Sequence, residues 1–531
     1  MAAPTAEPAA TPAPARAARN WRAWLLRLTA AAASGAVFYL AFAPRDLWWL
    51  APPAFLGLGL VLRGRRFWGG LGYGFVFGLA LYLPLLHWLQ DFLGRGFGPA
   101  PWLALSAALA LYLGLASALS TLVAKLPGAP VWTALVIVAS ETPRTWWPFG
   151  GFPWGRVAFS QAEGAYTPLA AVGGAPLTGF AVVVTGFGAA TLLPHLRRAA
   201  GSGRRARTLP AIATVVPVVA GLALWPTIGT SAQAGTRTVA IVQGNAPDAG
   251  LDLMAEAPTL RANHLAQSEA LAAQIRAGAV PAPDLVVWPE TATDLGATDP
   301  VIDRTVRDLG APTLIGARHR EPGAKTRNTE FVWDPVTGRG RSYTKQELVP
   351  FAEFVPARAI ARWFTPFVDD TGDMAAGTTP AVLDAAGTRL AVPICYEIAY
   401  DHVSRDAVRD GAQLIVLPTN NAWFGRSEMT YQQLAMARLR AVEHARAVVV
   451  SSTSGVSALV GPDGTVTAAT SQFTAETLVG NVPLRTQTTL SDRLGAWTEY
   501  VLVGAAIAAV AAAIVVRVRT RGTSTTATRA D

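Results

Sequence analysis

Residues 391–400 read A-V-P-I-C-Y-E-I-A-Y and contain Cys395, the one cysteine in a chain of 531 residues. An apolar run of strand character, Leu390–Ile394, leads into the thiol, and the polar residues Tyr396 and Glu397 follow at once. This order is typical of a reactive side chain at the end of a buried strand. A single cysteine is more often a small buried hydrophobic residue, so the rest of the chain has to decide between the two interpretations.

The composition indicates a membrane protein. Hydrophobic residues make up 51% of the chain and charged residues 15%, and there are 17 Trp, which is too apolar for an ordinary soluble protein. The net charge is +9, but the Arg clusters lie between apolar segments, where they indicate topology and anionic lipid headgroups. We therefore expect membrane lipid, and no nucleic acid, among the partners. One cysteine also excludes an intramolecular disulfide.

The apolar segments predict about eight membrane spans, because several approach the ~20 residues that cross a bilayer. They lie near Leu25–Ala43, Leu47–Leu62, Phe67–Leu89, Trp102–Ala124, Val131–Trp147, Leu169–Leu193, Leu209–Thr227 and Tyr500–Val516. The second is short and contains two prolines, so the count is uncertain by one. Arg and Lys gather in alternate loops, which places both termini in the cytoplasm and the segment after Thr227 outside.

Between the last two spans the pattern changes to short β-type runs that alternate with amphipathic stretches, which predicts an α/β domain. The runs are 238–243, 285–288, 313–317, 330–333, 389–394, 413–417, 447–452 and 457–460, and the helical candidates are 255–277, 300–309, 403–409 and 428–445. The expected order is a disordered tail over 1–24, a transmembrane bundle of about seven helices over 25–228, the α/β domain over 237–486, a transmembrane helix over 498–516 and a cytoplasmic tail over 517–531.

Two further motifs supply partners for the thiol. The run V-V-W-P-E-T at 286–291 places Glu290 just past a hydrophobic strand, as a general base requires, and Y-T-K-Q-E-L-V-P-F-A-E-F-V-P at 343–356 offers Lys345 and Glu353. Alone, Glu290 could be a structural acid and Lys345 a solvated charge. An acid, an amine and a lone thiol at strand ends together form a candidate catalytic group.

Glu, Lys and Cys in this order resemble the nitrilase superfamily, whose catalytic domain is a four-layer α-β-β-α sandwich. The motifs W-P-E, K-x-x-L-V-P-F-x-E-F-V-P, C-Y-E and N-x-A-W-F-G (420–425) lie between membrane spans. Together they make the chain similar to the apolipoprotein N-acyltransferase family, a membrane-bound branch of that superfamily, over nearly its whole length. The likeness extends to G-F-P-W-G-R-V-A-F-S-Q at 151–161 and Q-G-N at 243–245.

The resemblance implies a reaction and a role for each residue. Glu290 would be the general base, Lys345 would stabilise the oxyanion, and Cys395 would take an acyl chain from a phospholipid as a thioester. The α-amine of a diacylated apolipoprotein would then accept that chain. Glu353 is expected to orient Lys345. Tyr396 and Glu397 match family positions needed for activity, although a structural role in the turn is an equal alternative.

The resemblance also implies a multi-pass protein of the bacterial plasma membrane, with its catalytic domain on the extracytoplasmic side. We expect a monomer without cofactor. We also expect no metal, because the six His are scattered without ligand spacing. Trp423, Phe351 and Phe364 are candidates for lining the acyl path, with ordinary core packing as the alternative. The loop 369–379 is a candidate lid.

Some positions depart from the family pattern. Glu347 stands where His is common, Ala352 where Gly is common, and Asn421 where Asp is common, so Asn421 is assigned no catalytic part. No Trp follows Q-G-N within 246–254. Three alternatives stay open: a membrane-tethered amidase that hands the acyl group to water, a silent scaffold, and a transporter. The retained Glu, Lys and Cys disfavour a scaffold, and the many spans disfavour a hydrolase of small amides.

Overall fold

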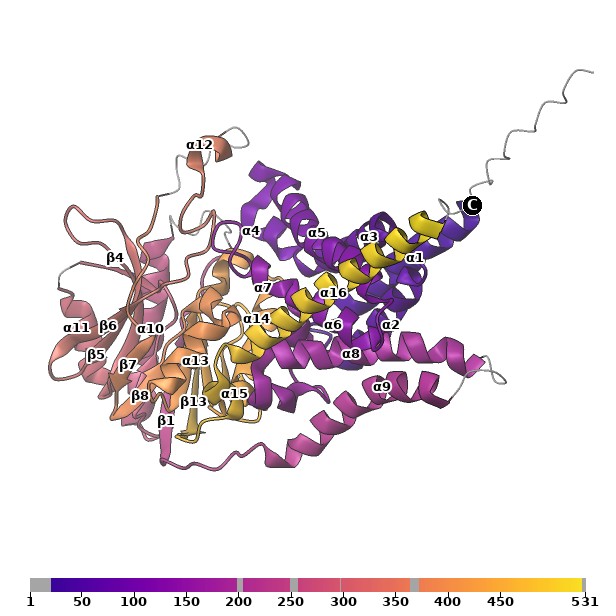
Figure 1. Cartoon of the computed structure of the whole chain (residues 1–531). Helices are drawn as coiled ribbons and strands as arrows, with labels where there is room; N and C mark the ends of the chain where they lie inside the picture. The colour runs from indigo at the N-terminus through magenta and orange to yellow at the C-terminus, as the bar shows by residue number, and fades with distance from the viewer. Residues whose placement is uncertain (1–20, 198–203, 249–255, 297, 363–371, 528–531) are drawn as a thin grey trace, which may run out of the picture.

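The computed structural model describes residues 21–197, 204–248, 256–296, 298–362 and 372–527. Its N-terminal helices form a bundle, and its strands form an α/β part beside one end of that bundle (Figure 1). The last helix, α16 (Trp497–Ala527), leaves the α/β part and runs back along the bundle against α5, α6 and α8. The α/β part is therefore attached to the bundle at both ends of its sequence.

The bundle packs its helices closely where glycine lines the contact. Its helices are α1 (Trp21–Tyr39), α2 (Ala51–Leu62), α3 (Phe67–Leu85), α4 (Trp88–Phe97), α5 (Ala100–Val123), α6 (Ala129–Ala139), α7 (Glu141–Arg144), α8 (Ala170–Arg197) and α9 (Arg204–Leu224), with 3-10 turns η1 (Trp48–Leu50), η2 (Val157–Ser160), η3 (Thr167–Leu169) and η4 (Trp225–Thr227). A Cβ on Gly70 of α3 would stand 2.7 Å from the Ser117 carbonyl oxygen of α5. Glycine here lets two backbones approach, as small residues do in membrane helix pairs.

Five helices are long and apolar enough to cross a membrane among the residues described. They are Phe67–Leu85, Ala100–Val123, Thr167–Leu196, Arg207–Thr227 and Trp497–Thr520. Each overlaps one of the predicted spans. The other three predicted spans correspond to α1, α2 and α6, which have 19, 12 and 11 residues and do not meet the same criteria of length and hydropathy.

Three predicted boundaries differ from the structure. The span predicted over 131–147 stops at Ala139, and a separate turn, α7, follows because Glu141 and Arg144 form a buried ion pair there. The span predicted to Leu89 ends at Leu85, next to Pro84, and α4 is a helix of its own. Helix α16 continues past 516 to Ala527.

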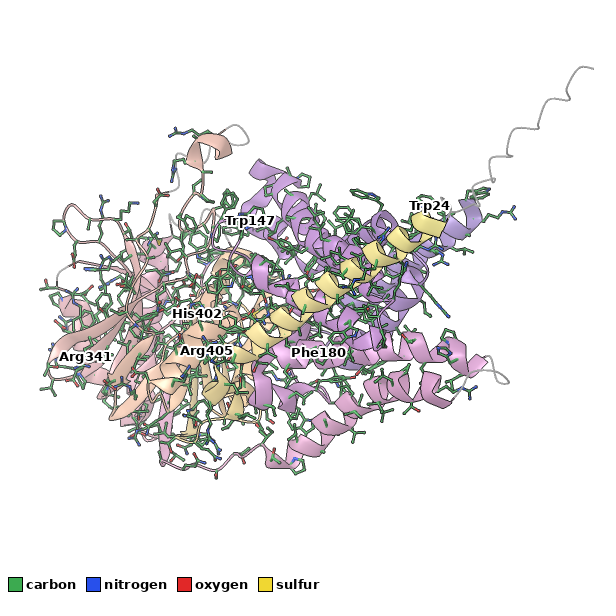
Figure 2. All side chains as sticks on the ribbon, in the orientation of Figure 1. Trp24, Trp147, Phe180, Arg341, His402 and Arg405 are labelled. Carbon is green, nitrogen blue, oxygen red and sulfur yellow. The ribbon has the colours of Figure 1, made fainter. Side chains whose placement is uncertain are left out.

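Aromatic residues lie at both ends of the bundle. Figure 2 shows Trp147 at the end beside the α/β part and Trp24 at the opposite end, and both are exposed, at 69% and 47%. Charged residues such as Arg341 lie on the α/β part away from the bundle. This distribution is typical of a helical bundle with interfacial aromatic belts.

The strands form two mixed sheets. The first has the order β13-β1-β2-β4-β5-β6, with β3 beside β4, and the second has the order β12-β11-β10-β9-β8-β7. The bounds are β1 (Thr236–Gln243), β2 (Leu285–Val287), β3 (Thr293–Leu295), β4 (Thr313–His319), β5 (Arg327–Asp334), β6 (Gly338–Thr344), β7 (Val382–Ala385), β8 (Thr388–Ala391), β9 (Leu414–Thr419), β10 (Val448–Ser452), β11 (Ala458–Val460), β12 (Val466–Ala469) and β13 (Glu476–Pro483).

The central strands of the first sheet are buried on both faces. Val239 and Ile241 of β1 belong to a core that also contains residues of the second sheet, whereas Ala240 and Val242 belong to a core under helices α10 (Ala257–Arg276) and α11 (Pro300–Leu309). The second sheet carries α13 (Asp401–Arg409) and α14 (Met429–His444), and the short α15 (Leu490–Leu494) leads to α16. Alternate residues of a strand point to opposite faces, so this pattern fixes the register of β1.

Candidate active site

Glu290, Lys345 and Cys395 each follow a strand of the α/β part. Glu290 comes after β2 and the pair Trp288–Pro289, Lys345 directly follows β6, and Cys395 comes after β8. The strand before the thiol is shorter than the predicted run, since β8 ends at Ala391. All three side chains are buried, with 4%, 1% and 6% of their surface exposed. Electrostatic interactions between them are therefore only weakly screened by water.

The Glu290 carboxylate is held by three donors. Its Oε1 accepts from the Lys345 Nζ at 2.9 Å and from the Asn328 Nδ2 at 2.6 Å, and its Oε2 accepts from the backbone N–H of Asn420 at 2.9 Å. Burial disfavours the charge, but the Lys345 ammonium and these hydrogen bonds outweigh burial and hold the pKa of Glu290 below its usual value. Glu290 is thus ionised at neutral pH and free of a proton of its own, although its low pKa makes it a weaker base than an ordinary glutamate.

Glu353 lies on the other side of the Lys345 ammonium. Its two oxygens are 3.2 and 3.1 Å from Nζ, its Oε1 also accepts from Asn328 at 2.7 Å, and its Oε2 accepts from the Val349 N–H at 2.8 Å. Burial opposes the charge of Lys345, but Glu290 and Glu353 together raise the pKa of Lys345 well above its usual value. Two carboxylates occupy two of its three N–H groups, which leaves the third for a substrate oxygen.

Cys395 begins a 3-10 turn, η7 (Cys395–Ala399), in a strained backbone conformation. Its φ is 51°, a left-handed value that costs a non-glycine residue about 1–2 kcal/mol. Burial, and then the Glu290 carboxylate, raise the pKa of the thiol to about 12, while Lys345 opposes this rise. The Gln433 Nε2 lies 3.6 Å from Sγ and donates to it. The resting group is a neutral thiol that needs a base in order to react.

Glu397 fastens two segments of the site together. Its Oε1 accepts from the Tyr343 hydroxyl at 2.8 Å and from the backbone N–H groups of Gln346 and Glu347 at 2.7 and 3.1 Å. Its Oε2 accepts from the Ile394 N–H at 2.7 Å. The loop that carries Lys345 and the backbone that carries Cys395 are therefore held by one buried carboxyl group, and Glu397 lies two residues from the thiol without pointing at it.

A loop of the bundle covers the turn that follows the thiol. The Tyr396 hydroxyl donates to the Gly151 carbonyl at 3.3 Å, and its ring stacks on Trp154 with centroids 6.4 Å apart. The Tyr400 hydroxyl donates to the Gly150 carbonyl at 3.1 Å. Gly151 has a φ of 84°, and a Cβ there would lie 2.1 Å from the carbonyl carbon of Thr145. Only glycine fits this tight turn.

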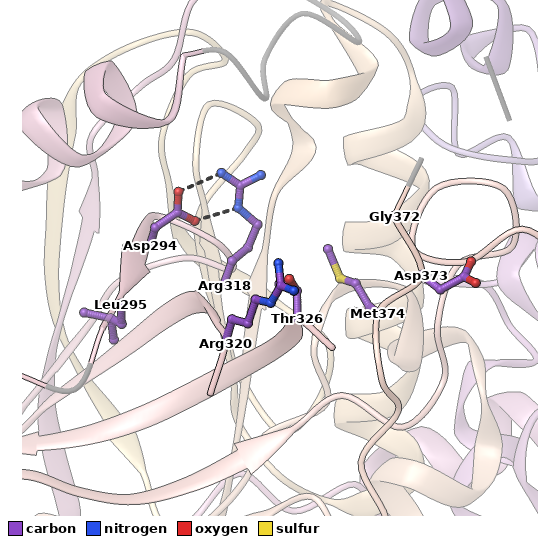
Figure 3. A pocket seen from close by; sticks show the side chains of 8 residues that line it. All are labelled: Asp294, Leu295, Arg318, Arg320, Thr326, Gly372, Asp373 and Met374. Carbon is purple, nitrogen blue, oxygen red and sulfur yellow. Dashed lines mark hydrogen bonds and ion pairs between the residues drawn. The ribbon is translucent and has the colours of Figure 1, made fainter. Parts of the chain in front are cut away.

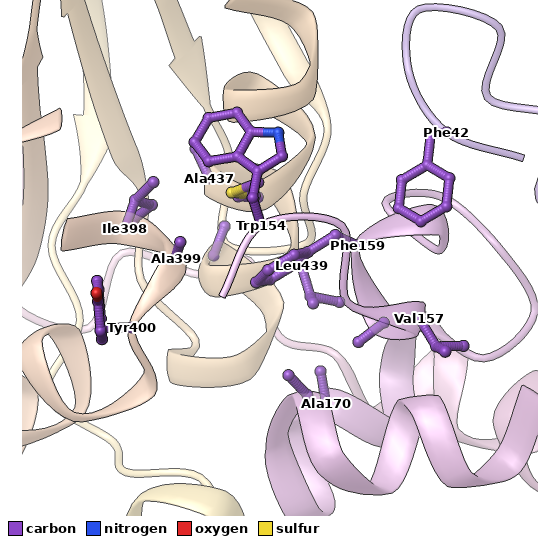
Figure 4. Packing of buried hydrophobic residues seen from close by; sticks show 14 of the residues in the cluster. Phe42, Trp154, Val157, Phe159, Ala170, Ile398, Ala399, Tyr400, Ala437 and Leu439 are labelled. Carbon is purple, nitrogen blue, oxygen red and sulfur yellow. The ribbon is translucent and has the colours of Figure 1, made fainter. Parts of the chain in front are cut away.

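Trp154 and its neighbours continue the core from the bundle into the α/β part. Figure 4 shows Trp154 beside Ile398, Ala399 and Ala437, with Phe159 further into the bundle. Gln432 of α14 accepts from the Trp154 indole at 2.7 Å and donates to the Leu85 carbonyl at 3.0 Å. Helix α14 therefore binds the bundle through Gln432 and reaches the thiol through Gln433, the next residue.

Buried ion pairs join the same two parts of the molecule. Asp401 lies between two arginines, 2.7 Å from Arg156 of the bundle and 2.6 Å from Arg440 of α14. Glu141 contacts Arg144 and Arg156, and Glu443 contacts Arg440. We call these residues the junction cluster: Glu141, Arg144, Arg156, Asp401, Arg440 and Glu443. Their charges balance, because three arginines face three carboxylates.

A pocket of about 340 Å³ is shown in Figure 3. It is lined by Asp294, Leu295, Arg318, Arg320, Thr326, Gly372, Asp373 and Met374, and none of Glu290, Lys345 and Cys395 is among them. Thr326 comes two residues before Asn328, and the Met374 N–H donates to the Glu353 carbonyl at 2.7 Å, so the pocket is connected to the site through the backbone. The second half of the predicted lid is tied down by these bonds, since the Gly377 N–H also donates to the Lys345 carbonyl at 2.8 Å.

The three residues predicted to contact substrate have different surroundings. Trp423 is half-buried and packs on the small cluster around Leu260, with its ring 6.2 Å from that of Phe92 of α4. Phe351 is 51% exposed, and its ring lies 6.1 Å from that of Phe149 in the bundle. Phe364 lies outside the described residues. Trp423 and Phe351 thus both lie where the α/β part meets the bundle.

The sequence patterns did not point to Asn328, Thr419 or Gln433. Asn328 lies on a strand that was expected to begin only at 330, and Gln433 lies on a helix whose apolar pattern indicated packing alone. Glu347, one of the departures from the family pattern, contacts His402 at 3.1 Å. A polar side chain on an otherwise buried strand or helix face was the available signal, because such groups need a partner.

The chain matches two family models. Residues 34–188 match the apolipoprotein N-acyltransferase N-terminal domain, and residues 238–490 match the carbon-nitrogen hydrolase model. An apolipoprotein N-acyltransferase of Mycolicibacterium smegmatis is 36% identical over 512 residues, which covers 92% of this chain and 85% of that protein. Apolipoprotein N-acyltransferases of Azotobacter vinelandii and Pseudomonas syringae are 33% and 31% identical, each over 87% of this chain and over 90% and 91% of their own lengths.

These relatives are bacterial, and the likeness spans both the bundle and the α/β part. The first model covers most of the bundle, including the loop that packs on Tyr396, and the second covers all three strand ends of the site. The fold of the α/β part is that of the carbon-nitrogen hydrolases, joined here to several apolar helices. The chain belongs to the apolipoprotein N-acyltransferase family.

Proposed function

We propose that the protein transfers an acyl chain from a phospholipid, through a thioester on Cys395, to the N-terminal α-amine of diacylglyceryl-cysteine apolipoproteins. The observation that carries this proposal is the hydrogen-bonded group of Glu290, Lys345 and Glu353 beside the thiol, in a chain of the apolipoprotein N-acyltransferase family. The product is a triacylated lipoprotein, and the two substrates react in turn.

In the first half-reaction Glu290 takes the thiol proton while the sulfur attacks the ester carbonyl carbon of the phospholipid. At pH 7 a thiol with a pKa of about 12 is ionised to the order of one part in 10⁵, so attack requires the base. The free N–H of Lys345 and the Tyr396 backbone N–H hold the oxyanion, each contributing on the order of 3 kcal/mol. The intermediate then expels the lysophospholipid, whose oxygen takes the proton from Glu290.

In the second half-reaction the α-amine of the acceptor, in its neutral form, attacks the thioester carbonyl carbon. Glu290 accepts a proton from the attacking nitrogen, and Lys345 again holds the oxyanion. The carbon–sulfur bond breaks, the amide forms, and the thiolate leaves and takes back the proton from Glu290. Glu353 and Asn328 act on Lys345 and Glu290 rather than on substrate. They keep the two groups at their hydrogen-bonding distance throughout.

The surroundings of the thiol favour a lipid donor over a water-soluble amide. The turn after Cys395 is packed against Gly150, Gly151 and Trp154 of the bundle, so the nucleophile lies at the contact between α/β part and bundle. Exposed aromatic side chains, Trp147 and Phe351 among them, lie at the same end of the bundle. A lipid whose tails stay in the bilayer reaches a thiol placed there without full extraction into water.

Several finer features belong to this proposal. They are about eight spans, an α-β-β-α sandwich, the division at 1–24, 25–228, 237–486, 498–516 and 517–531, a monomeric state, and an extracytoplasmic catalytic part with both termini in the cytoplasm. The alternating Arg-rich loops support the orientation. The helices on the outer face of each sheet support the sandwich. Cysteine-scanning accessibility in intact cells, on a Cys395→Ser background, measures the orientation.

The test of the reaction is acyl transfer in detergent micelles with a defined phospholipid and a diacylated lipopeptide. Mass spectrometry is expected to find a fatty acyl thioester on Cys395 when phospholipid is present alone, and N-acylated lipopeptide once the acceptor is added. Cys395→Ser should form neither. Retention of N-acylation by Cys395→Ser would refute the mechanism, and release of free fatty acid as the sole product would support the amidase instead.

A further inference from the structure

Two neutral polar side chains, Thr419 and Gln433, reach the sulfur of Cys395, a third, Asn421, bonds to both of them, and the proton transfers described above use none of the three. Thr419 ends β9, Asn421 begins the 3-10 turn η8 (Asn421–Phe424), and Gln433 lies on α14. All three are buried, at 0%, 3% and 1% exposure. Buried polar groups that share hydrogen bonds fix one another's orientation, since each unsatisfied partner costs about 1–3 kcal/mol.

The hydrogen bonds of the Gln433 amide determine which of its ends faces the thiol. Its Oε1 accepts from Asn421 Nδ2 at 3.2 Å and lies 2.9 Å from Thr419 Oγ1, whose single proton is shared between this oxygen and Asn421 Oδ1. Its other end, Nε2, lies 3.6 Å from the Cys395 sulfur and donates to it. Thr419 Oγ1 is also 2.7 Å from Asn421 Oδ1, so the three side chains form a closed group. An N–H group pointing at sulfur stabilises the thiolate over the thiol.

We propose that Gln433 is a further catalytic residue and that Asn421 is its positioning residue: the Asn421 N–H donates to Oε1 of Gln433 and thereby holds Nε2 toward the sulfur of Cys395, where it stabilises the thiolate during attack and departure. The catalytic consequence rests on the proposed function, whereas the effect on the thiolate does not. Asparagine at 421 is a residue type that this arrangement needs, because a carboxylate has no N–H to give.

The charged groups near the sulfur come from other elements. Glu290 follows β2 and Lys345 follows β6, with Glu353 behind Lys345, and Glu397 of the same turn points its oxygens at backbone N–H groups. From β9 and α14 the groups that reach the sulfur, Thr419 and Gln433, are neutral. Hydrogen bonds from this neutral side lower the pKa of the thiol against the rise due to burial and Glu290.

Asn421→Asp changes one atom of the group but also brings a negative charge near the sulfur, so it is compared with Gln433→Met, which brings none. The new carboxylate accepts from Gln433 Nε2, so the amide turns and presents Oε1 to the sulfur, which disfavours the thiolate. Asn481→Asp is the matched control, because Asn481 is exposed on β13 and its Oδ1 accepts from the Thr238 hydroxyl at 2.8 Å, a bond that a carboxylate keeps. The same change of charge is thus made far from the site.

The readout is alkylation of Cys395, which as the single cysteine reports without interference and without lipid. The full-length protein in detergent is treated with iodoacetamide and, separately, N-ethylmaleimide between pH 7 and 10. Asn421→Asp is expected to slow both reagents by about tenfold at each pH, which corresponds to a rise of one unit in the thiol pKa. An unchanged rate, or unequal effects on the two reagents, which would indicate altered access, overturns the proposal.

Gln433→Met removes the donor in a side chain of similar length, and it decides the question if Asn421→Asp fails to fold. It is expected to give the same fall of about tenfold, and the double variant should be no slower than either single one, because both changes remove one interaction. Independent effects that multiply would overturn the coupling. If the unsubstituted protein showed no acyl transfer while both variants still slowed alkylation as expected, the proposed function would be refuted and the effect of Gln433 on the thiolate would stand.

Discussion

The catalytic group and the junction cluster are both networks of buried charge, but they are built from different residues. Around Lys345 one ammonium faces two carboxylates, Glu290 and Glu353, and among the described residues one of its N–H groups has no acceptor. In the junction cluster every cation is an arginine, and three arginines face three carboxylates. Lysine and glutamate exchange protons and reorient, whereas arginine keeps its charge and holds carboxylates in a planar fork.

This difference matches what each network has to do. The catalytic group must accept and return a proton at Glu290 in each half-reaction, so a carboxylate with a single ammonium neighbour suits it. The junction cluster must hold the bundle against the α/β part while lipids enter, so arginine, whose protonation is fixed, suits this cluster. Substitutions in the first should therefore reduce chemistry, and substitutions in the second should reduce stability.

Lys345→Met should have the largest effect on acyl transfer. Without the ammonium, Glu290 and Glu353 repel each other across a buried site, one of them takes up a proton, and the oxyanion loses its donor. We expect acyl-enzyme formation to fall by at least about 10³-fold, measured by single-turnover mass spectrometry of the thioester. Lys325→Met, at an exposed lysine, is the control. A fall of less than tenfold would assign the oxyanion to other donors.

Glu290→Gln separates the base from the fold. The amide oxygen still accepts from Lys345 and Asn328, but the amide NH2 faces the Asn420 N–H, so the free energy of unfolding should fall by about 1–3 kcal/mol, while acylation at pH 7 should fall by about 10²–10⁴-fold. The residual rate should then rise about tenfold per pH unit, because the thiol pKa of about 12 lies above the measured range and hydroxide replaces the base. A flat pH profile would contradict the role of Glu290, and Glu269→Gln on α10 serves as the matched control.

Asp401→Asn, in the junction cluster, should reduce stability and leave the reaction rate nearly unchanged. Arg156 and Arg440 lose the carboxylate they share, so the protein should lose about 3–5 kcal/mol of stability. The rate of acylation per folded molecule should change by no more than about threefold, as for a residue outside the site. Thermal unfolding in detergent measures the stability, and single-turnover acylation of the same sample measures the rate. A larger loss of rate than of stability would mean that the junction positions the thiol.

The sequence predicted the buried strands better than the edge strands. The runs at β1, β2, β4 and β9 to β11 are confirmed, because buried strands are rich in Val, Ile and Leu. Strands β3, β6, β7, β12 and β13 were missed. Four of them form the edges of the two sheets, β6 and β13 in the first and β7 and β12 in the second. Most residues of β6 are exposed, so its sequence G-R-G-R-S-Y-T has no apolar pattern, and the strand that leads to Lys345 was not predicted.

The site residues that lie within a sequence motif were predictable, whereas those whose role depends on a contact with a distant segment were not. Glu290, Lys345 and Glu353 were named from motifs, and the structure brings them within hydrogen-bonding distance of one another. Asn328 was not named. Its role depends on two carboxylates that come from positions 38 and 25 residues away in the chain. Local periodicity carries no information about such contacts, which arise only when the strands pair.

Glu330 is a buried carboxyl group of a third kind, one that has no hydrogen-bond partner among the described residues. It has no exposed surface, and neither of its oxygens has a hydrogen-bond partner among the residues described. It lies two residues from Asn328 on β5 and opposite Gly316 of β4, where a Cβ would stand 2.9 Å from its Oε2 and 2.2 Å from the Pro289 carbonyl oxygen. Burial, and then the Glu290 carboxylate, raise the pKa of Glu330 well above its usual value, so the group is a neutral acid.

Glu330→Gln should consequently have the smallest effect on acyl transfer, because a neutral amide replaces a neutral acid of the same shape. Stability should respond to pH instead. A carboxyl group whose folded pKa is raised contributes most below its unfolded pKa near 4.3, and its contribution falls by about 1.4 kcal/mol for each pH unit above that until the folded pKa is reached. The unfolding temperature of Glu330→Gln should therefore match that of the unsubstituted protein at pH 4.5 and exceed it at higher pH, and Glu269→Gln, at an exposed position, is the control over the same range. A variant that loses stability at pH 8 would show that Glu330 is ionised in the folded protein, and Glu290 would then share its site with a second negative charge.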